Sequence, residues 1–503
     1  MAHVREAPTE DTVIVSHNPA TGERIGEVNV FSGDDVERAV ADARNAQKAW
    51  SALSFKERRR HLLRFRQVIV DRTDEICLRI SQENGKTLQE ALMCEVLPTV
   101  DLLTYFAKRA EKLLSPKKIS LHLFKQRASY IHYAPRGVVG IISPWNFPFA
   151  IPMGEAIMAL LAGNAVVLKP SEVTPLIALF AKELYLESGM PPDLFQVVTG
   201  RGQTGQALIE SGIDMMFFTG SVRTGKRVAQ ECGARLIPCV TELGGKAPAI
   251  VCKDADLERT ANALIWGGFA NSGQVCASVE RVYVPESIHD RLLEKVVQKT
   301  QSLRQGKPDS HNTDVGAICF ERQLSVAEDL IGDAVEHGAL IRTGGRRKEG
   351  DGMFFQPTVL EGVTQDMRIA HEEIFGPVLP FVKVKNIQEA IRHANDSHLG
   401  LIAYVFTQDR VKGRGLAEQI ESGTVMVNDV LATYGMPETP WQGVKESGVG
   451  FVHTDDGLRN MCQSRHVHYD RLMSLKKEPW WYPYSESRFN LLKKFMNLLF
   501  KRP

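Results

Sequence analysis

The segment WGGFANSGQVCAS, from Trp266 to Ser278, contains a single cysteine, Cys276, after a turn of small and polar residues. Free cysteine is among the most buried residue types, so Cys276 could simply fill space in a core. The polar context ANSGQ, unlike the apolar ALIW before it, favours exposure at a turn. An exposed thiol is a candidate nucleophile, because its thiolate form is intrinsically very reactive.

A candidate acid or base lies in TELGGK, where only Leu243 separates Glu242 from a double glycine. Glycines let the backbone approach another group closely, and such a turn could hold a carboxylate at the edge of a cleft. Taken alone, Glu242 is more simply interpreted as a solvated residue. A cysteine, a carboxylate and a nucleotide site in one chain would together support covalent catalysis followed by hydride transfer.

Three turns are candidates for nucleotide binding. GRGQTG (Gly200 to Gly205) and FTGSVRTGK (Phe218 to Lys226) each follow an apolar run and open a helical one, so their N–H groups could face a pyrophosphate. A tight turn needs glycine with or without a ligand, so neither motif decides the question alone. In LKPSE, Lys169 and Glu172 follow a strand, and a carboxylate there favours NAD over NADP because it suits the ribose hydroxyls.

The elements that must position these residues form an α/β pattern. Short apolar runs that alternate with helical segments, such as GVVGII, NAVVLK and MMFF, predict a parallel, doubly wound sheet. A second alternating region runs from about Glu242 to Gln442, and the first hundred residues are predicted to be mostly helical. The segment SLHLFKQRASYIHYAP alternates as a β-hairpin does.

Composition excludes several classes of protein. A chain of 503 residues with 43% apolar and 24% charged composition is expected to fold as two or three globular domains. A net charge of +1 gives no reason to expect a nucleic-acid partner. The eight cysteines form no CxxC pair and no metal-ligand spacing, which predicts free thiols and no metal site. Without an apolar leader or a membrane-spanning window, the protein is expected to be cytoplasmic.

Seven motifs occur in a recognisable order along the chain: SPWNFP, LKPSE, FTGS, ELGGK, FANSGQVC, EEIFGPV and GVKESG. Together with NPATGE at Asn18 they extend to about Met461, and in this order they resemble the aldehyde dehydrogenase superfamily. The resemblance implies a Rossmann-like parallel-sheet cofactor domain, an α/β catalytic domain and a small β element for oligomerisation.

The resemblance also implies roles for individual residues. Cys276 would be the nucleophile that adds to the aldehyde, and Asn146 would form an oxyanion hole with the Cys276 backbone N–H. Glu242 would be the general base that activates water, and its presence argues against acylating relatives that transfer to coenzyme A. The implied cofactor residues are Trp145, Lys169 and Glu172 for the adenosine, Gly202, Gly220 and Ser221 for the adenine and pyrophosphate, and Glu373 and Phe375 for the nicotinamide riboside.

The domain boundaries follow from the same resemblance. The expected NAD-binding domain comprises 1–118 and 135–244, the catalytic domain 245–445, the oligomerisation elements 119–134 and 446–475, and a C-terminal amphipathic extension 476–503. The hairpin would serve subunit association, so a homodimer or a homotetramer is expected.

The C-terminal extension combines an aromatic group with a basic amphipathic helix. Apolar residues from Phe489 to Phe500 fill one broad arc of a helical wheel, while Lys493, Lys494 and Lys501 share the other. Docking on protein and peripheral membrane contact through 488–503 both fit this pattern. The aromatic residues Trp480, Trp481, Tyr482 and Tyr484 could line a gate, fold against the core or lie at a lipid interface.

Within the superfamily, VERVYVPES, VNDVLATYG and KKEPWWYPYSE most resemble a bacterial group that includes dehydrogenases of carotenoid dialdehydes and long apolar aldehydes. Gln442 and Phe451 depart from the usual glycine and arginine near the substrate end. We expect oxidation of an apolar, medium- to long-chain or apocarotenoid-type aldehyde to a carboxylic acid with NAD, with NADP as the alternative cofactor. The alternative functions are a coenzyme A-acylating enzyme and a non-catalytic binding protein on the same scaffold.

Overall fold

The computed structural model describes residues 12–471, 476–478 and 480–501 of the chain. Contacts divide it into two compact units. The first unit comprises Met1–Leu113 and Pro135–Cys462, and the second comprises Leu114–Ala134 and Gln463–Pro503. The expected division into cofactor, catalytic and oligomerisation domains is a functional one, and it stays a prediction.

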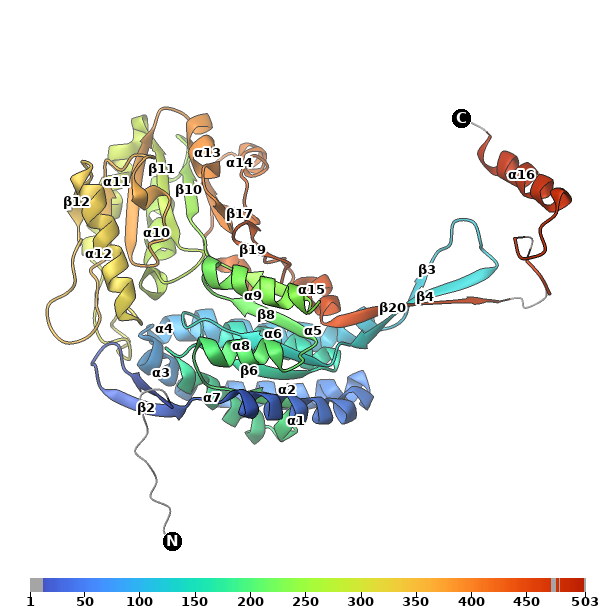
Figure 1. The fold of residues 1–503 in the computed structure, drawn as a ribbon. Coiled ribbons are helices and arrows are strands. Elements are labelled where there is room, and N and C mark those ends of the chain that lie inside the picture. The colour runs from blue at the N-terminus through green and yellow to red at the C-terminus, as the bar shows by residue number, and fades with distance from the viewer. Residues whose placement is uncertain (1–11, 472–475, 479, 502–503) are drawn as a thin grey trace, which may run out of the picture. The chain divides into compact units, whose positions relative to one another are not determined.

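The amino-terminal part of the first unit is a strand pair followed by helices, as Figure 1 shows in blue. The predicted helical character is confirmed, and capping residues explain where the helices begin: Ser32 and Ser54 each form a capping box with an acidic residue three positions later. The elements are β1 (Val13–His17), β2 (Arg24–Asn29), α1 (Gly33–Ala52), α2 (Phe55–Asp71), α3 (Thr73–Asn84), α4 (Leu88–Ala91), a π-helical turn (Leu92–Val96) and α5 (Leu97–Leu114).

A six-stranded sheet follows, with the strand order β19-β9-β8-β5-β6-β7. Its strands are β5 (Val138–Ile142), β6 (Ala165–Lys169), β7 (Phe195–Val197), β8 (Met215–Thr219), β9 (Cys239–Glu242) and β19 (Gly448–Val449), and its helices are α6 (Ala150–Ala162), α7 (Pro175–Glu187), α8 (Gly202–Glu210) and α9 (Val222–Ala234). All neighbours pair in parallel except β19, which is antiparallel to β9. The predicted parallel, doubly wound sheet is confirmed.

The strand order has a consequence for ligand binding. From β5 the chain moves outward to β6 and β7, and then returns to the other side of β5 to form β8 and β9. Ligands of open α/β sheets bind where the strand order reverses, outside the carboxyl ends of the strands. The three candidate nucleotide turns follow β6, β7 and β8 at these ends, and Trp145 follows β5.

The second α/β region forms a seven-stranded sheet with the order β12-β13-β14-β11-β10-β16-β17. Helices pack against this sheet (Figure 1). The strands are β10 (Ala247–Val251), β11 (Val279–Pro285), β12 (Leu340–Thr343), β13 (Thr358–Glu361), β14 (Val378–Val384), β16 (Ile402–Phe406) and β17 (Thr424–Val427). The helices are α10 (Leu257–Phe269), α11 (Glu286–Gln301), α12 (Glu321–Glu336), α13 (Ile387–Asn395) and α14 (Arg410–Ala417). A two-stranded sheet of β15 (Leu399–Gly400) and β18 (Val444–Lys445) and the helix α15 (Thr454–Asn460) complete the unit.

The second unit contains a three-stranded sheet, β20-β4-β3, and the helix α16 (Glu486–Phe500). The predicted hairpin is present, but its strands are β3 (Lys117–Ile119) and β4 (Arg127–Pro135). The first half of the predicted hairpin, 120–126, is not a strand: it contains the LHLF residues and connects β3 to β4. The third strand is β20 (Cys462–Asp470).

Candidate active site

Cys276 lies between α10 and β11, after a short 3-10 turn (Ala270–Gly273) with unusual backbone geometry. Asn271 and Ser272 have φ angles of 51° and 54°, a left-handed conformation that costs free energy in residues other than glycine. The surrounding structure holds this turn: Asn271 N–H donates to Glu90 Oε1 at 2.7 Å, and Ser272 Oγ donates to the Gly316 carbonyl at 3.0 Å. The thiol is thus presented by a tightly constrained loop.

The double glycine after Glu242 packs directly against this loop. A Cβ atom at Gly245 would lie 2.1 Å from the Cys276 carbonyl oxygen, which no side chain tolerates. A Cβ atom at Gly244 would lie 2.8 Å from Glu373 Oε2. The close backbone approach that the sequence predicted at this turn is therefore present, and its partner is the cysteine loop.

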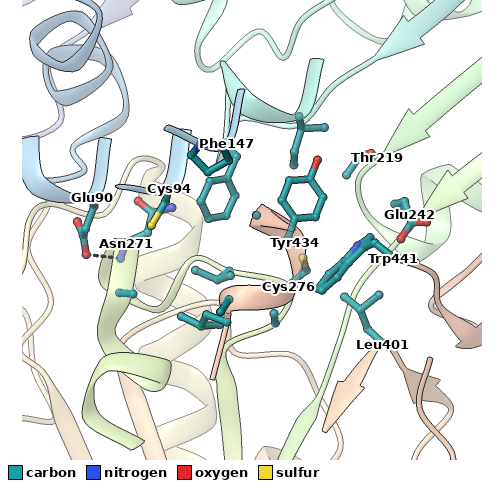
Figure 2. A pocket seen from close by; sticks show the side chains of 18 of the residues that line it. Glu90, Cys94, Phe147, Thr219, Glu242, Asn271, Cys276, Leu401, Tyr434 and Trp441 are labelled. Atoms are coloured by element: carbon teal, nitrogen blue, oxygen red, sulfur yellow. Dashed lines mark hydrogen bonds between the residues drawn. The ribbon is translucent and has the colours of Figure 1, made fainter. Parts of the chain in front are cut away.

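Cys276 and Glu242 line one cavity of about 130 Å³ (Figure 2). Most of its wall is apolar or aromatic. The wall includes the apolar and aromatic residues Met93, Phe147, Trp266, Leu401, Leu431 and Trp441 and the titratable residues Lys86, Glu90, Cys94, Glu155 and Tyr434. A reactive thiol and a carboxylate therefore share a largely dry space that can receive an apolar molecule.

Glu242, the last residue of β9, is 6% exposed, so the expectation of a solvated side chain is wrong for this residue. Burial raises its pKa well above the ordinary value, and the nearby Glu155 carboxyl raises it further. The Trp441 side chain lies beside the carboxylate and opposes this rise in pKa, yet neither oxygen has a partner of hydrogen-bonding geometry among the described residues. A buried, unpartnered carboxyl of this kind is typical of a functional site.

The Cys276 thiol faces the cavity and is otherwise surrounded by protein. Burial raises its pKa to about 12, and the carboxyl groups of Glu373 and Glu242 act in the same direction. The resting thiol is therefore protonated at neutral pH, and a base must remove its proton before or during nucleophilic attack.

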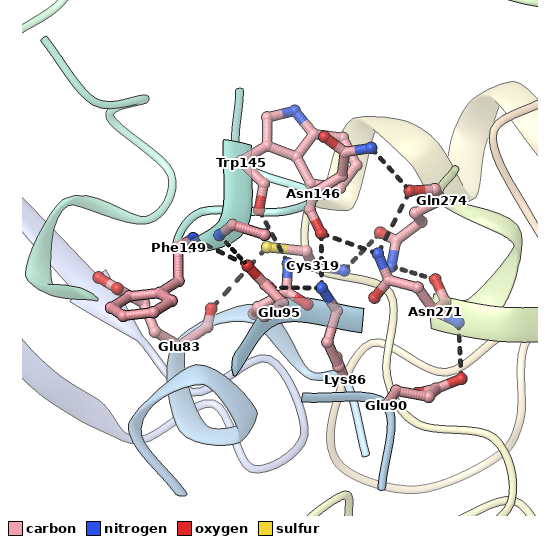
Figure 3. A network of polar contacts seen from close by, with 12 residues as sticks. Glu83, Lys86, Glu90, Glu95, Trp145, Asn146, Phe149, Asn271, Gln274 and Cys319 are labelled. Atoms are coloured by element: carbon pink, nitrogen blue, oxygen red, sulfur yellow. Dashed lines mark hydrogen bonds and ion pairs between the residues drawn. The ribbon is translucent and has the colours of Figure 1, made fainter. Parts of the chain in front are cut away.

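Asn146 follows β5 and contacts the cysteine loop. Its Nδ2 donates to the Gln274 carbonyl at 3.0 Å, two residues before Cys276 (Figure 3). The Asn146 carbonyl accepts from Asn271 Nδ2 at 3.0 Å and from Lys86 Nζ at 2.8 Å. These hydrogen bonds therefore fix the position of Asn146 relative to the cysteine loop.

A buried ion pair, absent from the sequence-based prediction, underlies this network. Lys86 Nζ and Glu95 Oε1 lie 2.6 Å apart, and both side chains are fully buried. The second carboxylate oxygen of Glu95 accepts from the backbone N–H groups of Phe149 and Ala150 at the start of α6 (Figure 3). The only signal for this pair in the sequence is that Glu95 lies in the apolar run ALMCEV, whereas Lys86 lies in the polar stretch ENGKTLQE and gives no signal.

The other predicted cofactor residues gather at the carboxyl ends of the first sheet. Lys169 ends β6 and its Nζ lies 3.6 Å from Glu172 Oε2, with Lys169 buried and Glu172 exposed. Ser221 caps α9 after β8, Gly220 precedes it, and Gly202 begins α8 after β7. Residues far apart in sequence thus meet at one edge of the sheet, in the place where a dinucleotide binds in such folds.

Glu373 and Phe375 come from the second α/β region. Glu373 Oε1 accepts from Gly245 N–H at 2.9 Å, and burial raises the pKa of this carboxyl to about 8, with Glu280 acting in the same direction. Phe375 has a φ angle of 53°, and its ring meets the Trp145 ring edge to face at 5.4 Å. These residues therefore link the cysteine loop with the end of β5.

The fold and the cavity thus define a two-sheet α/β protein with a buried thiol and a buried carboxyl beside a dinucleotide-type sheet edge. Residues 5–467 match the model of the aldehyde dehydrogenase family. The chain belongs to this family. It is 38% identical over 496 residues to the 4,4'-diapolycopene aldehyde oxidase of a Methylomonas species, covering 97% of this chain and 92% of that protein.

Other relatives differ in their named substrate and cofactor. A Mycolicibacterium smegmatis protein, provisionally named as an NADP+-dependent succinate-semialdehyde dehydrogenase, is 38% identical over 458 residues, with 90% of this chain and 88% of that protein covered. The NAD-dependent aldehyde dehydrogenase of Sinorhizobium meliloti has a similar structure, with a TM-score of 0.89, 36% identity and 93% of each chain covered. An NADP-dependent Escherichia coli enzyme gives a TM-score of 0.87 at 32% identity, covering 91% of this chain and 95% of the other.

Replacing Lys86 by Met is expected to lower the free energy of unfolding by about 3–5 kcal/mol, because Glu95 would then be buried without its counter-ion. The measurement is the urea midpoint of unfolding. Arg24→Ala provides a control, since the Arg24–Glu27 pair is exposed and its loss should cost at most about 1 kcal/mol. Equal, small effects of both substitutions would contradict a structural role for the buried pair.

The raised pKa of Cys276 predicts how the thiol reacts with iodoacetamide. Because only the thiolate reacts, the rate of alkylation should rise about tenfold per pH unit between pH 7 and about 10. Mass spectrometry of the peptide that contains Cys276 would follow this rate, with Cys276→Ala as the blank. A rate that is already maximal near pH 7 would show that the thiolate is preformed.

Proposed function

We propose that this aldehyde dehydrogenase oxidises its substrate through Cys276 and Glu242. The single observation that supports this most is that the thiol and the unpartnered carboxyl line one cavity. The Cys276 sulfur forms a bond to the aldehyde carbon as the thiol proton passes to a base, which gives a thiohemiacetal. When bound, the nicotinamide cofactor supplies the acceptor for the hydride whose loss turns this adduct into a thioester.

Hydrolysis then requires an activated water molecule. Glu242 removes a proton from water as the oxygen adds to the thioester carbon. The C–S bond breaks, the carboxylic acid leaves, and the sulfur is reprotonated. The Asn146 amide carries two N–H groups, and the one not donated to Gln274 would bind the oxyanion together with the Cys276 backbone N–H.

We propose NAD as the cofactor. The residues at the carboxyl ends of β5, β6, β7 and β8 fit a dinucleotide, because they combine helix amino-termini, glycine turns and the Lys169–Glu172 pair. Glu172 is exposed enough to accept hydrogen bonds from ribose hydroxyls, and its charge would repel a 2′-phosphate. Trp145 would face the adenosine together with Lys169 and Glu172. Gly202, Gly220 and Ser221 would face the adenine and pyrophosphate, and Glu373 and Phe375 the nicotinamide riboside.

We infer that the substrate is an uncharged, apolar aldehyde of medium to long chain, with apocarotenoid aldehydes within this class. Lys86 is the only cationic residue in the described cavity wall, and Glu95 and the Asn146 carbonyl already engage its ammonium group. Glu155 and Glu242 also line the wall. A carboxylate on the substrate, as in succinate semialdehyde, would therefore enter a cavity with carboxyl groups and no free cation, which is unfavourable.

The test is reduced-nicotinamide formation by the purified protein with NAD and a series of aldehydes from short to long chain. The value of kcat/KM should rise with chain length, and it should fall by at least about a thousandfold in Cys276→Ala, which removes the nucleophile. Glu242→Gln should retain a burst of about one reduced nicotinamide per site and lose steady turnover, because the thioester then persists.

Two rival functions predict different results in the same assay. A coenzyme A-acylating enzyme would release product only after coenzyme A is added. A non-catalytic binding protein would give no turnover with any aldehyde, with either NAD or NADP.

We propose that the three-stranded sheet of the second unit mediates homodimer or homotetramer formation. The strand β20 is exposed from Gln463 to Val467 and forms an edge of this sheet, so its backbone N–H and C=O groups can pair with another copy. Within this unit, Arg127 forms an ion pair with Glu478, and Trp480 packs edge to face on Phe124 at 5.4 Å. Of the roles considered for Trp480, this contact favours packing against the β3–β4 hairpin over lining a gate to the substrate cavity.

We also propose that α16 brings this cytoplasmic enzyme to anionic membranes. None of the described residues of α16 is buried, although one arc of the helix is apolar. The opposite arc carries Lys493, Lys494 and Lys501, which would attract anionic lipid headgroups. No helix in the described part of the chain is sufficiently long and apolar to cross a bilayer.

Co-sedimentation with vesicles of phosphatidylglycerol and phosphatidylcholine tests this contact. Phe495→Gln with Leu498→Gln should weaken binding about a hundredfold or more, since each side chain contributes at least about 1.5 kcal/mol on burial. The matched control is Asn490→Gln with Asn497→Gln on the polar arc, which should bind like the unchanged protein. A chain that lacks 488–503 should not bind. Equal binding by all variants, or no binding by the full chain, would exclude the membrane contact.

A further inference from the structure

The helix α6 contains one charged residue, Glu155, and all thirteen of its residues are buried. Glu155 is 4% exposed and lines the same cavity as Cys276 and Glu242. An ionised carboxyl in the middle of such a helix is costly unless it is paired or hydrogen-bonded. The position of Glu155 is therefore unexplained by folding alone.

No cation in the described cavity wall compensates Glu155 or Glu242. Lys86 donates to Glu95 and to the Asn146 carbonyl, and Glu90 accepts from the Asn271 and Thr87 backbone N–H groups. The titratable or charged groups that line the cavity are Lys86, Glu90, Cys94, Glu155, Glu242, Cys276 and Tyr434. Glu155 and Glu242 are thus two carboxyl groups that face one apolar space without a counter-ion.

Two carboxyl groups in such a space do not both ionise readily, because burial and the like charge each disfavour the second ionisation. Burial raises the pKa of Glu155 to about 8. The pKa of Glu242 is raised well above its ordinary value by burial, and then by Glu155. A charge on Glu155 therefore raises the pKa of Glu242 further, so Glu242 holds its proton more strongly when Glu155 is ionised.

We propose that Glu155 and Glu242 are electrostatically coupled across the substrate cavity, and that the charge state of Glu155 controls when Glu242 becomes a base. This proposal rests on the proposed role of Glu242 in thioester hydrolysis. Glu155 is a positioning residue, because it acts on the reaction only through Glu242. It was not among the residues that the motifs indicated, since it lies inside a continuous apolar run.

The proton balance of the hydrolytic step follows. Glu242 acts as the base in its carboxylate form, and this form is favoured when Glu155 is protonated, so that the pair carries one negative charge. Glu242 then takes a proton from water as the C–O bond forms, the C–S bond breaks, and the departing sulfur takes this proton to regenerate the thiol. Glu242 is then a carboxylate again, Glu155 has kept its proton, and the product is the carboxylic acid.

Glu155→Gln tests the proposal through the pH dependence of kcat for steady turnover. Removing the like charge should move the half-maximal pH of the acidic limb down by about one unit or more. Glu155→Asp keeps a carboxyl group, so its half-maximal pH should stay close to that of the unchanged protein. Glu83→Gln is the matched control, because Glu83 is also a buried carboxyl with a pKa raised to about 7 by burial, but it bonds Ser16 outside the cavity.

A second measurement needs no turnover. In the Cys276→Ala background, infrared difference spectra follow the protonated-carboxyl band of Glu242 as pH rises, with Glu242→Gln identifying the band. Glu155→Gln should lower the midpoint of this titration by about one unit or more. An unchanged midpoint would overturn the coupling of the two carboxyl groups whether or not the protein oxidises aldehydes. A shifted midpoint without any aldehyde oxidation would reject the proposed function alone.

Discussion

The ion pair between Lys86 and Glu95 is the interaction on which the geometry of the candidate site depends. Burying two charges is costly, and the pair is stable only because other groups satisfy the remaining hydrogen-bonding capacity of the ammonium and the carboxylate. Lys86 also donates to the Asn146 carbonyl, and Glu95 also accepts from the two N–H groups that begin α6. A carboxylate is favoured at that end of a helix, where the backbone N–H groups are otherwise unpaired.

This arrangement transmits one constraint to several functional groups. The start of α6 is fixed by Glu95, and Glu155, which lines the cavity, follows about one and a half turns later in the same helix. The Asn146 carbonyl, held by Lys86, also accepts from Asn271 in the strained turn before Cys276. The thiol, the amide and the second carboxyl are therefore positioned through a single buried charge pair, and the backbone strain at the cysteine loop is compensated by these contacts.

The sequence predicted features that have a local cause. Glycine turns after apolar runs marked the strand ends, and the double glycine after Glu242 predicted a close backbone approach, which occurs at Gly245. Lys86, Glu95 and Glu155 were missed because a charged residue is normally solvated, and only tertiary packing makes these three buried. The first half of the predicted hairpin was assigned wrongly because the alternation in SLHLF predicted a strand, whereas β4 pairs with Lys117–Ile119 instead.

The same desolvation links substrate choice to base strength. A cavity that excludes water accommodates an apolar aldehyde, and it also raises the pKa of Glu155 to about 8 and of the Cys276 thiol to about 12. A base acts on such a thiol efficiently only when its own pKa is high, so a carboxyl in a wetter site would be too weak a base. An aldehyde that carried water or a cation into the cavity would lower the pKa of Glu242, and it would thereby reduce the basicity on which its own oxidation depends.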